Sequence, residues 1–520
     1  MTRLVRGLWL TVVAAVLLRL FLLAWLPLID PAEGRYGEIG RKMAELGDWV
    51  TPWHQYGVPF WGKPPLSFWM TAAGIEVLGV SEFAARLPHL VAGLATAGLV
   101  WNAARQRQPE VGAMAAAMLG TALLFFLSSG AVMTDAALVL GSTMAATGAW
   151  LAIAGEDAGQ RRRQAWLAVL GGAIGVLAKG PLALVVVGVP LLMWAAWCGR
   201  WRVLWGALPW GRGLALMGVL CLPWFIWAEA RTPGFLEYFL VGEHYHRFMT
   251  PGWAGDLYGK AHHEPKGMIW GFAVMACLPW TLIVPALAAW RTWQDGRQPP
   301  PNAPRAPETG PWGITDREEG RFLLLWSLVP LGLFSASSNV IWTYALPAMP
   351  ALAWWAARWM GTRPAQGLRW SLAGAWLAIV AWVVLAAAAQ QMGRLERGSA
   401  KGLVAACHAA WQRHAPHALA GPPGLRGDQA EPQLVLLGRR SFSAHFYTHG
   451  RAIRVDNLAE VGQRWPRHGT CLAAKLDETQ ALASVPFGVT VVEDLGIHHE
   501  RRLWWVRARP TDGAPAGVAN

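Results

Sequence analysis

The amino-acid sequence predicts an all-α polytopic membrane protein with about 11–13 transmembrane helices and a small C-terminal α/β domain. Of its 520 residues, 54% are hydrophobic and only 15% are charged, where a soluble protein carries roughly a quarter. The 34 Trp residues suit a bilayer interface, because the indole ring is amphipathic. This composition excludes a disordered chain, a disulfide scaffold and an ordinary cytosolic enzyme. The net charge of +13 comes mostly from Arg between apolar runs and does not indicate nucleic-acid binding.

Arginine counts between the apolar runs predict the topology. Arg3 and Arg6 place the N-terminus in the cytoplasm, ahead of an uncleaved first span, and every second gap between later spans is basic. Eleven spans satisfy this parity, so we interpret Leu66–Val80 as a helix lying at the outer surface; a twelfth span there is the alternative. The apolar spans lie near residues 7–28, 84–104, 111–128, 132–154, 165–178, 182–198, 213–229, 267–290, 321–337, 341–359 and 370–390.

This topology divides the chain into a membrane domain and a tail. Residues 1–390 form the membrane domain, with large outer loops at 29–83, which carries amphipathic helices, and at 230–266. A Pro-rich cytoplasmic linker covers 292–320. The tail is outside: residues 391–510 alternate β-like and helix-like runs, which predicts an α/β domain, and 511–520 form a disordered end. The β-like runs are Gln433–Leu437, Thr470–Ala474, Val489–Glu493 and Leu503–Arg507.

The first outer loop concentrates acidic and basic residues beside the membrane. Asp30 lies at the outer mouth of the first span, and Pro31 can start a surface helix that carries Glu33, Arg35 and Tyr36. Two carboxylates and an Arg suit activation of an acceptor hydroxyl and binding of a phosphate. The alternative is a solvated loop with ordinary ion pairs.

Lysines and a carboxylate recur at the outer ends of other spans. Lys63 lies between aromatic residues and a Pro pair and can reach a lipid phosphate, or it can simply extend to water at the interface. Asp135 begins the fourth span, where facing lipid would cost about 2.5–3.5 kcal/mol, so it should face a cavity. Lys179 lies in an outer turn. Asn339 and Tyr344 could line the same cavity, with interfacial anchoring of Tyr344 as the alternative.

The second outer loop is rich in titratable residues. Glu243, His244 and Arg247 form one cluster, and His262 and His263 follow. The histidines are weak candidates for a divalent metal site, because no HExxH or similar spacing is present. Arg247 could hold a phosphate. The five cysteines show no CxxC or zinc spacing, and Cys407 and Cys471 in the tail can pair. The arginine-derived topology puts all these clusters on one side, which predicts one outward-facing site.

The motifs then resemble those of the aminoarabinose-transferase and protein O-mannosyltransferase-like families of GT-C membrane glycosyltransferases. The resemblance runs over most of residues 1–360. It rests on ordered motifs: Asp30-Pro-Ala-Glu33-Gly-Arg35-Tyr36-Gly-Glu38-Ile, Gly47-Asp48-Trp49-Val50-Thr51-Pro52, Lys63-Pro64-Pro65-Leu66, Ala85-Arg86-Leu87-Pro88, Thr134-Asp135, Lys179-Gly180-Pro181, Glu243-His244 with Arg247-Phe248, and Thr343-Tyr344-Ala-Leu-Pro347.

This resemblance implies a GT-C fold and a bacterial inner-membrane enzyme that moves a sugar from a polyprenyl-phosphate donor to a periplasmic acceptor, with inversion. The acceptor would be a lipid A-like glycolipid, a glycan or a protein. The chain departs from this pattern at two positions. Relatives usually carry Glu where this chain has Gly62, and this puts any metal site that uses that Glu in doubt. Relatives also often carry an acid where this chain has Ala32. The roles implied are catalytic for Asp30, Glu33 and Asp135, phosphate-binding for Lys63, Arg247 and Arg35, and cavity-lining for Tyr36, Lys179, Glu243, His244, Asn339 and Tyr344.

Two other classes of function stay open on the sequence. A transporter or lipid-linked sugar flippase would carry polar residues at mid-membrane depth and internal repeats, and neither is evident. A non-enzymatic assembly scaffold would act through the tail domain. A possible cofactor is a divalent metal ion.

Overall fold

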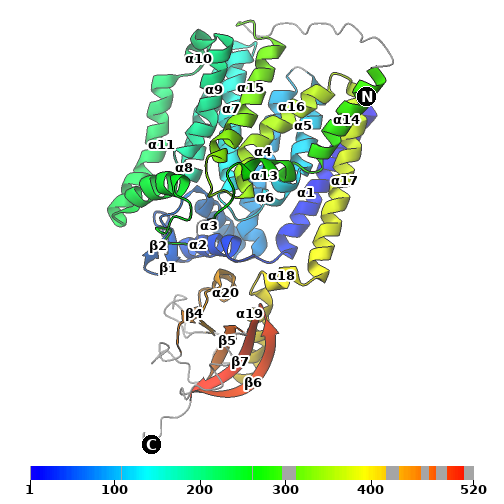
Figure 1. The fold of residues 1–520 in the computed structure, drawn as a ribbon. Coiled ribbons are helices and arrows are strands. Elements are labelled where there is room, and N and C mark those ends of the chain that lie inside the picture. The colour runs from blue at the N-terminus through cyan, green and yellow to red at the C-terminus, as the bar shows by residue number, and fades with distance from the viewer. Residues whose placement is uncertain are drawn as a thin grey trace, which may run out of the picture.

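The computed structural model describes residues 2–106, 108–259, 262–295, 312–416, 433–457, 468–475 and 489–508. It has two parts, a tall bundle of helices and a small sheet domain docked at one end of it (Figure 1). The predicted all-α membrane domain with a C-terminal α/β domain is confirmed. The C-terminal end of the Pro-rich linker lies within the described residues, whereas its residues 296–311 and the predicted disordered end at 511–520 lie outside them.

Every predicted span coincides with helix. Apolar runs bounded by Arg, Pro or Gly produce these helices, because a chain in lipid must satisfy its backbone groups internally. The long helices of the bundle are α1 (Thr2–Trp25), α4 (Glu82–Ala104), α5 (Pro109–Thr121), α7 (Asp135–Ala154), α8 (Ala158–Lys179), α9 (Leu182–Cys198), α11 (Trp210–Arg231), α14 (Trp280–Asp295), α15 (Asp316–Ser335), α16 (Met349–Met360) and α17 (Pro364–Gln391). The shorter helices are α6 (Leu123–Ser128), α10 (Trp201–Ala207), η1 (Glu237–His246), α12 (Arg247–Met249), α13 (Met268–Ala276), η2 (Trp342–Ala348) and α18 (Arg394–Arg397).

Not every helix is a full apolar span. Within the described ranges, α1, α4, α7, α11 and α17 are long and apolar enough to cross a bilayer, and counting the bent pair α13–α14 as one span gives up to six. The others are shorter, as is α9 with 17 residues, or begin with charged residues, as α15 does with Asp316, Glu318 and Glu319.

Three predicted spans are not the straight helices that the sequence suggested. The span at 267–290 is two helices bent by 82°, with Pro279 at the break, where its ring cannot continue a helix. The span at 111–128 breaks at Ala122, which is extended, and Leu123 N donates to Leu278 O across the break. The span at 341–359 opens as the 3₁₀ helix η2.

Small residues let the central helices pack closely. A Cβ on Gly141 of α7 would lie 2.4 Å from the backbone nitrogen of Gly175 on α8, so the two backbones are almost in contact, as is common between membrane helices. On the other side of α7, Trp150 stacks on Phe322 of α15 with ring centroids 4.8 Å apart. The buried core therefore runs through the middle of the bundle.

The first outer loop is built from short elements at one end of the bundle. It contains α2 (Ala32–Leu46), β1 (Trp53–Gln55), β2 (Val58–Pro59) and α3 (Leu66–Leu78). Helix α2 ends at Gly47, whose φ of 62° stops the helix in the left-handed conformation. The helix predicted at Leu66–Val80 is confirmed as the short helix α3 (Leu66–Leu78), and its place at the outer surface stays a prediction.

The tail forms a five-stranded mixed sheet with strand order β4-β3-β5-β7-β6. Helix α19 packs on one face through Leu403 and Trp411, which share a core with Trp505. A disulfide joins Cys407 of α19 to Cys471 of β5, which confirms the predicted pairing. The elements are α19 (Lys401–His414), β3 (Leu434–Leu437), α20 (Phe442–Tyr447), β4 (Ala452–Val455), β5 (Thr470–Lys475), β6 (Val489–His498) and β7 (Arg501–Ala508). Strand β4 was not predicted.

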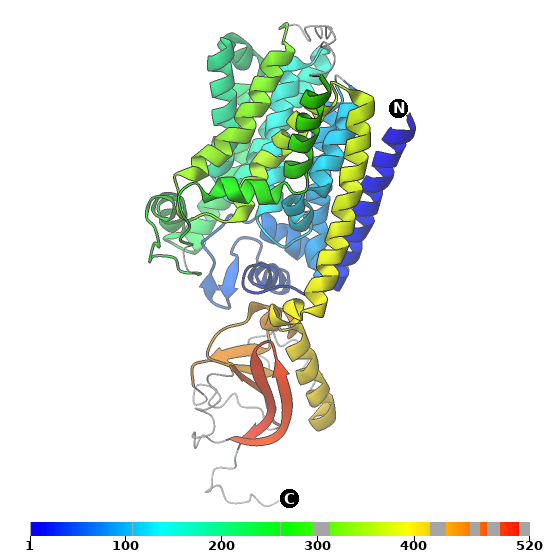
Figure 2. The same cartoon turned by 45° about the vertical axis from the view of Figure 1, so that its right-hand side comes forward.

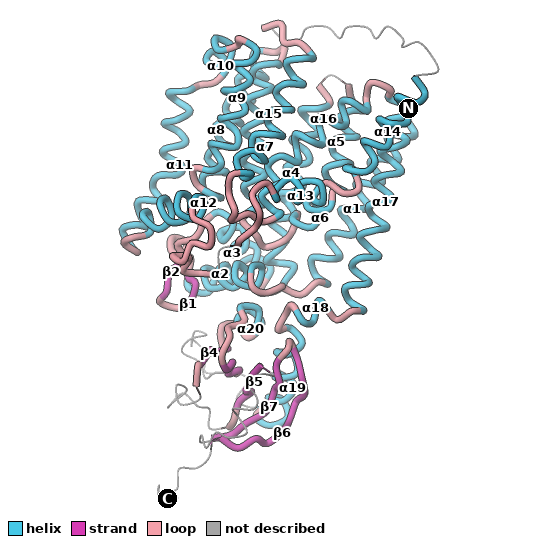
Figure 3. Tube along the Cα trace, in the orientation of Figure 1, coloured by secondary structure: helices cyan, strands magenta, loops and turns pink. Residues whose placement is uncertain are grey.

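The two ends of the bundle carry different parts of the chain. The N-terminus and α10 lie at one end, whereas α2, α3, the β1–β2 hairpin and the sheet domain lie at the other, as Figures 1 and 2 both show. The tube in Figure 3 places α12 toward that same end. The outer loops therefore meet at one end of the bundle, as predicted.

Candidate functional site

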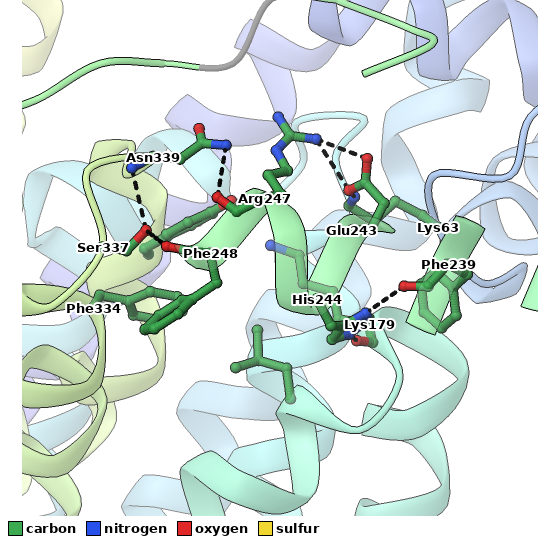
Figure 4. Close-up of a pocket in the computed structure, with 12 residues that line it drawn as sticks. Lys63, Lys179, Phe239, Glu243, His244, Arg247, Phe248, Phe334, Ser337 and Asn339 are labelled. Carbon is green, nitrogen blue, oxygen red and sulfur yellow. Dashed lines mark hydrogen bonds and ion pairs between the residues drawn. The ribbon is translucent and has the colours of Figure 1, made fainter. Parts of the chain in front are cut away.

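A cavity of about 90 Å³ lies among these loops, at the ends of the membrane helices (Figure 4). Four parts of the chain contribute: the loop before α3, the α8–α9 turn, the η1–α12 segment, and the stretch from α15 through η2. Seven residues selected from the sequence line it, namely Lys63, Lys179, Glu243, His244, Arg247, Asn339 and Tyr344. The structure adds Leu182, Phe239, Phe248, Phe334 and Ser337.

Glu243 joins two cations that lie far apart in the sequence. Lys63 Nζ donates to Glu243 Oε2 at 2.6 Å, and Arg247 Nη1 lies 2.9 Å from Oε1 and 3.0 Å from Oε2. Burial alone would raise the pKa of Glu243, but Lys63 and Arg247 outweigh it and lower that pKa. The carboxylate is therefore ionised at neutral pH. The Nε atom of Arg247 is buried without a hydrogen-bond partner among the described residues.

The π-helix η1 brings Glu243 and Arg247 to the cavity. Its wider turns are rare and recur at functional sites. Phe239 anchors it by stacking on Phe235, with ring centroids 5.6 Å apart. The adjacent turn needs Gly180, whose φ is 68° and whose missing Cβ would lie 2.6 Å from the Phe239 ring. Helix η1 thus packs directly on the α8–α9 turn.

Lys179 and Asp135 form a buried pair behind the cavity. Lys179 Nζ donates to Asp135 Oδ1 at 2.7 Å and lies 5.2 Å from the Tyr344 ring centroid. Their side chains are only 8% and 5% exposed. Asp135 therefore faces the bundle interior, as we expected from the free-energy cost of a carboxylate that faces lipid. Asp135 does not line the cavity itself but binds Lys179, which does.

Arg35 and Tyr36 lie in an aromatic cluster beside this region. Arg35 lies over the rings of Tyr36 and Phe60, at 5.1 and 5.6 Å, and Tyr36 packs edge-on against Phe68 at 5.7 Å. Neither Arg35 nor Tyr36 lines the cavity. The Nε atom of Arg35 is buried without a hydrogen-bond partner among the described residues, and a phosphate-binding role for Arg35 stays a prediction.

Glu33 lies away from the cavity and ties α2 to α4. Its carboxylate receives two hydrogen bonds of 2.7 Å from Arg86 and one of 3.2 Å from Val132 N. Burial would raise the pKa of Glu33, but the Arg86 guanidinium outweighs it and lowers that pKa. This engagement is that of a structural ion pair, and a catalytic role for Glu33 stays a prediction.

Asp30 also lies outside the lining of the cavity. Its carboxylate accepts hydrogen bonds from Ser441 and Ser443 of the sheet domain, and the His499 ring lies 3.8 Å away. These contacts all come from the sheet domain. The catalytic role of Asp30 stays a prediction.

The histidines within the described ranges do not assemble a metal site. Both ring nitrogens of His244 face carbonyl oxygens, Phe239 O at 2.7 Å and Lys179 O at 3.2 Å. His262 and His263 are exposed. Across the described ranges no three His, Cys, Asp or Glu side chains come together to hold a metal. These residues do not fit a metal ion.

The charges suit a phosphate. Among the lining residues Lys63, Lys179 and Arg247 are cationic and only Glu243 is anionic. Asp135 and Asp256 lie behind as partners of Lys179 and Arg247. A Lys and an Arg that share one carboxylate can transfer hydrogen bonds to an incoming anion.

Comparisons with known proteins agree with this geometry. A model of the dolichyl-phosphate-mannose-protein mannosyltransferase family matches residues 9–239. The crystal structure of ArnT from Cupriavidus metallidurans bound to undecaprenyl phosphate superposes with a TM-score of 0.67 at 21% identity, over 95% of this chain and 97% of that one. Residues 9–239 are thus similar to this family, and the chain has the GT-C fold. The expected resemblance is confirmed at this level.

Curated GT-C relatives match over a shorter region. An undecaprenyl phosphate-alpha-4-amino-4-deoxy-L-arabinose arabinosyl transferase of Pseudomonas paraeruginosa is 31% identical over 62% of this chain. One from Sodalis glossinidius is 31% identical over 67% of this chain. The matched region spans just over half the length of these relatives, 54% and 58%.

Sequence reasoning missed several residues that shape the site of this GT-C chain. Arg86 was within a motif but was not singled out, although its pairing with Glu33 decides where α2 lies. Ser441 and Ser443 gave no signal, because single serines in a tail domain are ordinary. Phe239 could have been found, since it lies one helical turn before Glu243 in a polar loop.

Proposed function

We propose that this chain is an inner-membrane glycosyltransferase that moves a sugar from a polyprenyl-phosphate donor to an extracytoplasmic acceptor: a lipid A-like glycolipid, a glycan or a protein. One observation carries the proposal. Lys63 and Glu243, 180 residues apart in sequence, meet with Arg247 in a cavity at the ends of the membrane helices. Such a cavity suits a charged headgroup that stays attached to a lipid.

The donor phosphate would lie between Lys63 and Arg247. Departure of a polyprenyl phosphate leaves negative charge on its oxygens, and two fixed cations stabilise that charge. Lys179, held by Asp135, supplies a third positive charge at the cavity wall. The names of the relatives, undecaprenyl phosphate arabinosyl transferases, support this donor class.

A second, apolar cavity lies between the membrane helices. It has a volume of about 280 Å³ and is lined by small and apolar residues of α7, α8, α9 and α11. Its residues Ala183 and Leu184 directly follow Leu182, which lines the polar cavity. A polar cavity and an apolar one that both border the start of α9 suit a molecule with a phosphate head and a prenyl tail.

Asp30 is the proposed general base. Asp30 does not line the cavity, so this role rests on the resemblance of its motif. In this role the carboxylate takes the proton of an acceptor hydroxyl while the sugar is transferred in one displacement with inversion. Where the acceptor is already a phosphate, no base is needed and Asp30 orients the acceptor instead. A contribution of a divalent metal is not part of this mechanism.

The proposed orientation has the N-terminus in the cytoplasm and the cavity and sheet domain in the periplasm. The Cys407–Cys471 disulfide supports it, because disulfides persist in oxidising compartments. Single cysteines introduced at the exposed positions His263 and Arg162 test it. A membrane-impermeant maleimide should label only the cysteine at 263 in intact spheroplasts, and labelling at 162 would reverse the orientation.

Transfer is tested with purified protein in liposomes, undecaprenyl-phosphate-linked sugar donors and lipid A. Lys63→Ala and Arg247→Ala should each lower kcat/KM by about 100-fold or more, while Lys266→Ala, an exposed lysine in the same outer region, should not. A wild-type kcat/KM in both Lys63→Ala and Arg247→Ala would contradict the proposed glycosyltransferase function. Lipid movement across the bilayer without sugar transfer would favour a flippase instead.

A further inference from the structure

We propose that the sheet domain supplies two positioning residues to the reaction, Ser441 and Ser443, which hold the carboxylate of Asp30. This inference rests on the proposed transfer reaction, in which Asp30 takes the acceptor proton. The sheet domain would then be part of the catalytic machinery and not only a recognition module.

Three hydrogen bonds define the arrangement. Ser441 Oγ donates to Asp30 Oδ2 at 2.6 Å, and Ser443 Oγ donates to the same oxygen at 2.8 Å. Ser443 N donates to Asp30 Oδ1 at 2.8 Å. Both carboxylate oxygens are thus held, which fixes the side-chain rotamer. A carboxylate has about four acceptor positions, so three bonds leave one for a substrate hydroxyl.

The backbone around Asp30 is built for this close approach. A Cβ at position 34 would lie 2.3 Å from Asp30 Oδ1 and 3.0 Å from Ser443 N, so only glycine leaves room for both groups. Asp30 N donates to Gly398 O at 2.8 Å, which fixes its main chain against the segment that leads into the sheet domain.

The positions of the two serines are fixed because α20 packs against the membrane domain and is hydrogen-bonded to it. Phe446 is 1% exposed and shares a core with Leu28 of the first loop. Tyr447 Oη accepts from Leu28 N at 2.8 Å and donates to Glu82 at 3.1 Å. Ser443 Oγ also accepts from Ala400 N at 2.9 Å. The position of α20 is therefore set independently of Asp30.

This arrangement gives the two serines a specific task. Without them the Asp30 side chain is free to rotate, and a displacement of about 1 Å in a catalytic group can cost about 100-fold in rate. Donor binding should not change, because neither serine lines the cavity that holds Lys63 and Arg247.

The test is steady-state kinetics of the full-length protein in liposomes. Ser441→Ala/Ser443→Ala should lower kcat about 10- to 100-fold and leave KM for the donor within about 2-fold. Ser441→Thr, which keeps the hydroxyl, should retain most of the rate that Ser441→Ala loses. Thr448→Ala, at the C-terminal end of the same helix, removes only local bonds to Ala444 O and His445 O and should change neither constant.

A second variant guards against misfolding of α20. Gly34→Ala keeps both serines but pushes Asp30 aside, and it should reproduce the kcat loss. An unchanged or raised kcat in the double serine variant, or a loss confined to KM, overturns the inference. If the proposed function itself is wrong, wild-type protein shows no transfer at all; if only this inference is wrong, Lys63→Ala is inactive while the serine variants keep the wild-type rate.

Discussion

At the scale of single residues, the outer end of this molecule is organised by charge pairs whose members come from distant segments. Lys63 meets Glu243, Lys179 meets Asp135, and Arg86 meets Glu33. Each residue is visible in the sequence as a charge near the end of an apolar run, but its partner is not. Pairing follows because an unpaired charge at this depth is costly.

Removing one member of the Asp135–Lys179 pair should cost more than removing both. Asp135→Ala leaves a buried ammonium without its partner, so we expect a loss of roughly 3–5 kcal/mol in the free energy of unfolding. Asp135→Asn/Lys179→Met removes both charges and should recover much of this loss. Unfolding in detergent measures both variants, and equal losses in the two would argue against a buried pair.

The lowered pKa of Glu33 makes a pH-dependent contribution to stability. Arg86 stabilises the ionised carboxylate in the folded state, so the contribution is fully present above the unfolded glutamate pKa of about 4.3 and is lost as pH falls through the lower folded pKa. The difference in Tm between wild type and Glu33→Gln should be constant from about pH 5 to pH 8 and should shrink below about pH 4.3. A difference that grows on acidification would contradict this sign.

At the scale of elements, close helix contacts depend on residues without side chains. Helices α7 and α8 approach so closely at Gly141 that any Cβ there would overlap the α8 backbone. The sequence pattern identified both helices but not their contact, because small residues also occur where nothing packs. Glycine at position 188 of α9 is such a case, with no atom within 4 Å of its Cβ position.

These two glycines provide a matched pair of variants. Gly141→Ala should lower the free energy of unfolding by about 1–3 kcal/mol, because the helices must separate. Gly188→Ala should be neutral or slightly stabilising, since alanine favours helix. Thermal unfolding of the detergent-solubilised protein distinguishes them, and equal Tm values for the two variants would refute the predicted contact.

At the scale of the whole molecule, the sheet domain and the first outer loop behave as one unit. Lys401 of α19 pairs with Glu82 of α4 at 2.6 Å, and Phe446 is buried against Leu28. The disulfide between Cys407 and Cys471 cross-links helix α19 to strand β5 within the domain. Loss of the sheet domain should therefore disturb the membrane domain at Asp30.

The disulfide should be intact and should stabilise the sheet domain. Three cysteines are free, Cys198, Cys221 and Cys277. Mass spectrometry after alkylation of the unfolded protein should find those three modified without reductant and all five after reduction. Cys407→Ser/Cys471→Ser should lower the stability of the domain by about 2–4 kcal/mol. Modification of five thiols in unreduced protein would contradict the bond.

The amino-acid sequence was sufficient to predict the apolar spans, their order, the α/β tail and seven of the twelve residues that line the cavity. Apolar runs long enough for a bilayer, Arg between them and polar clusters at their outer ends are local features, and local features can be recognised without a structure. Lys63, Glu243 and Arg247 could be placed on one side of the membrane in this way.

Only the tertiary structure decided which of these residues touch. It paired Glu33 with Arg86, put Asp30 against two serines of a domain more than 400 residues away in sequence, and bent the helix at Pro279 by 82°. These outcomes depend on contacts between segments far apart in the chain. Their free energy comes from shared burial and charge compensation, and neither is encoded in the residues nearby.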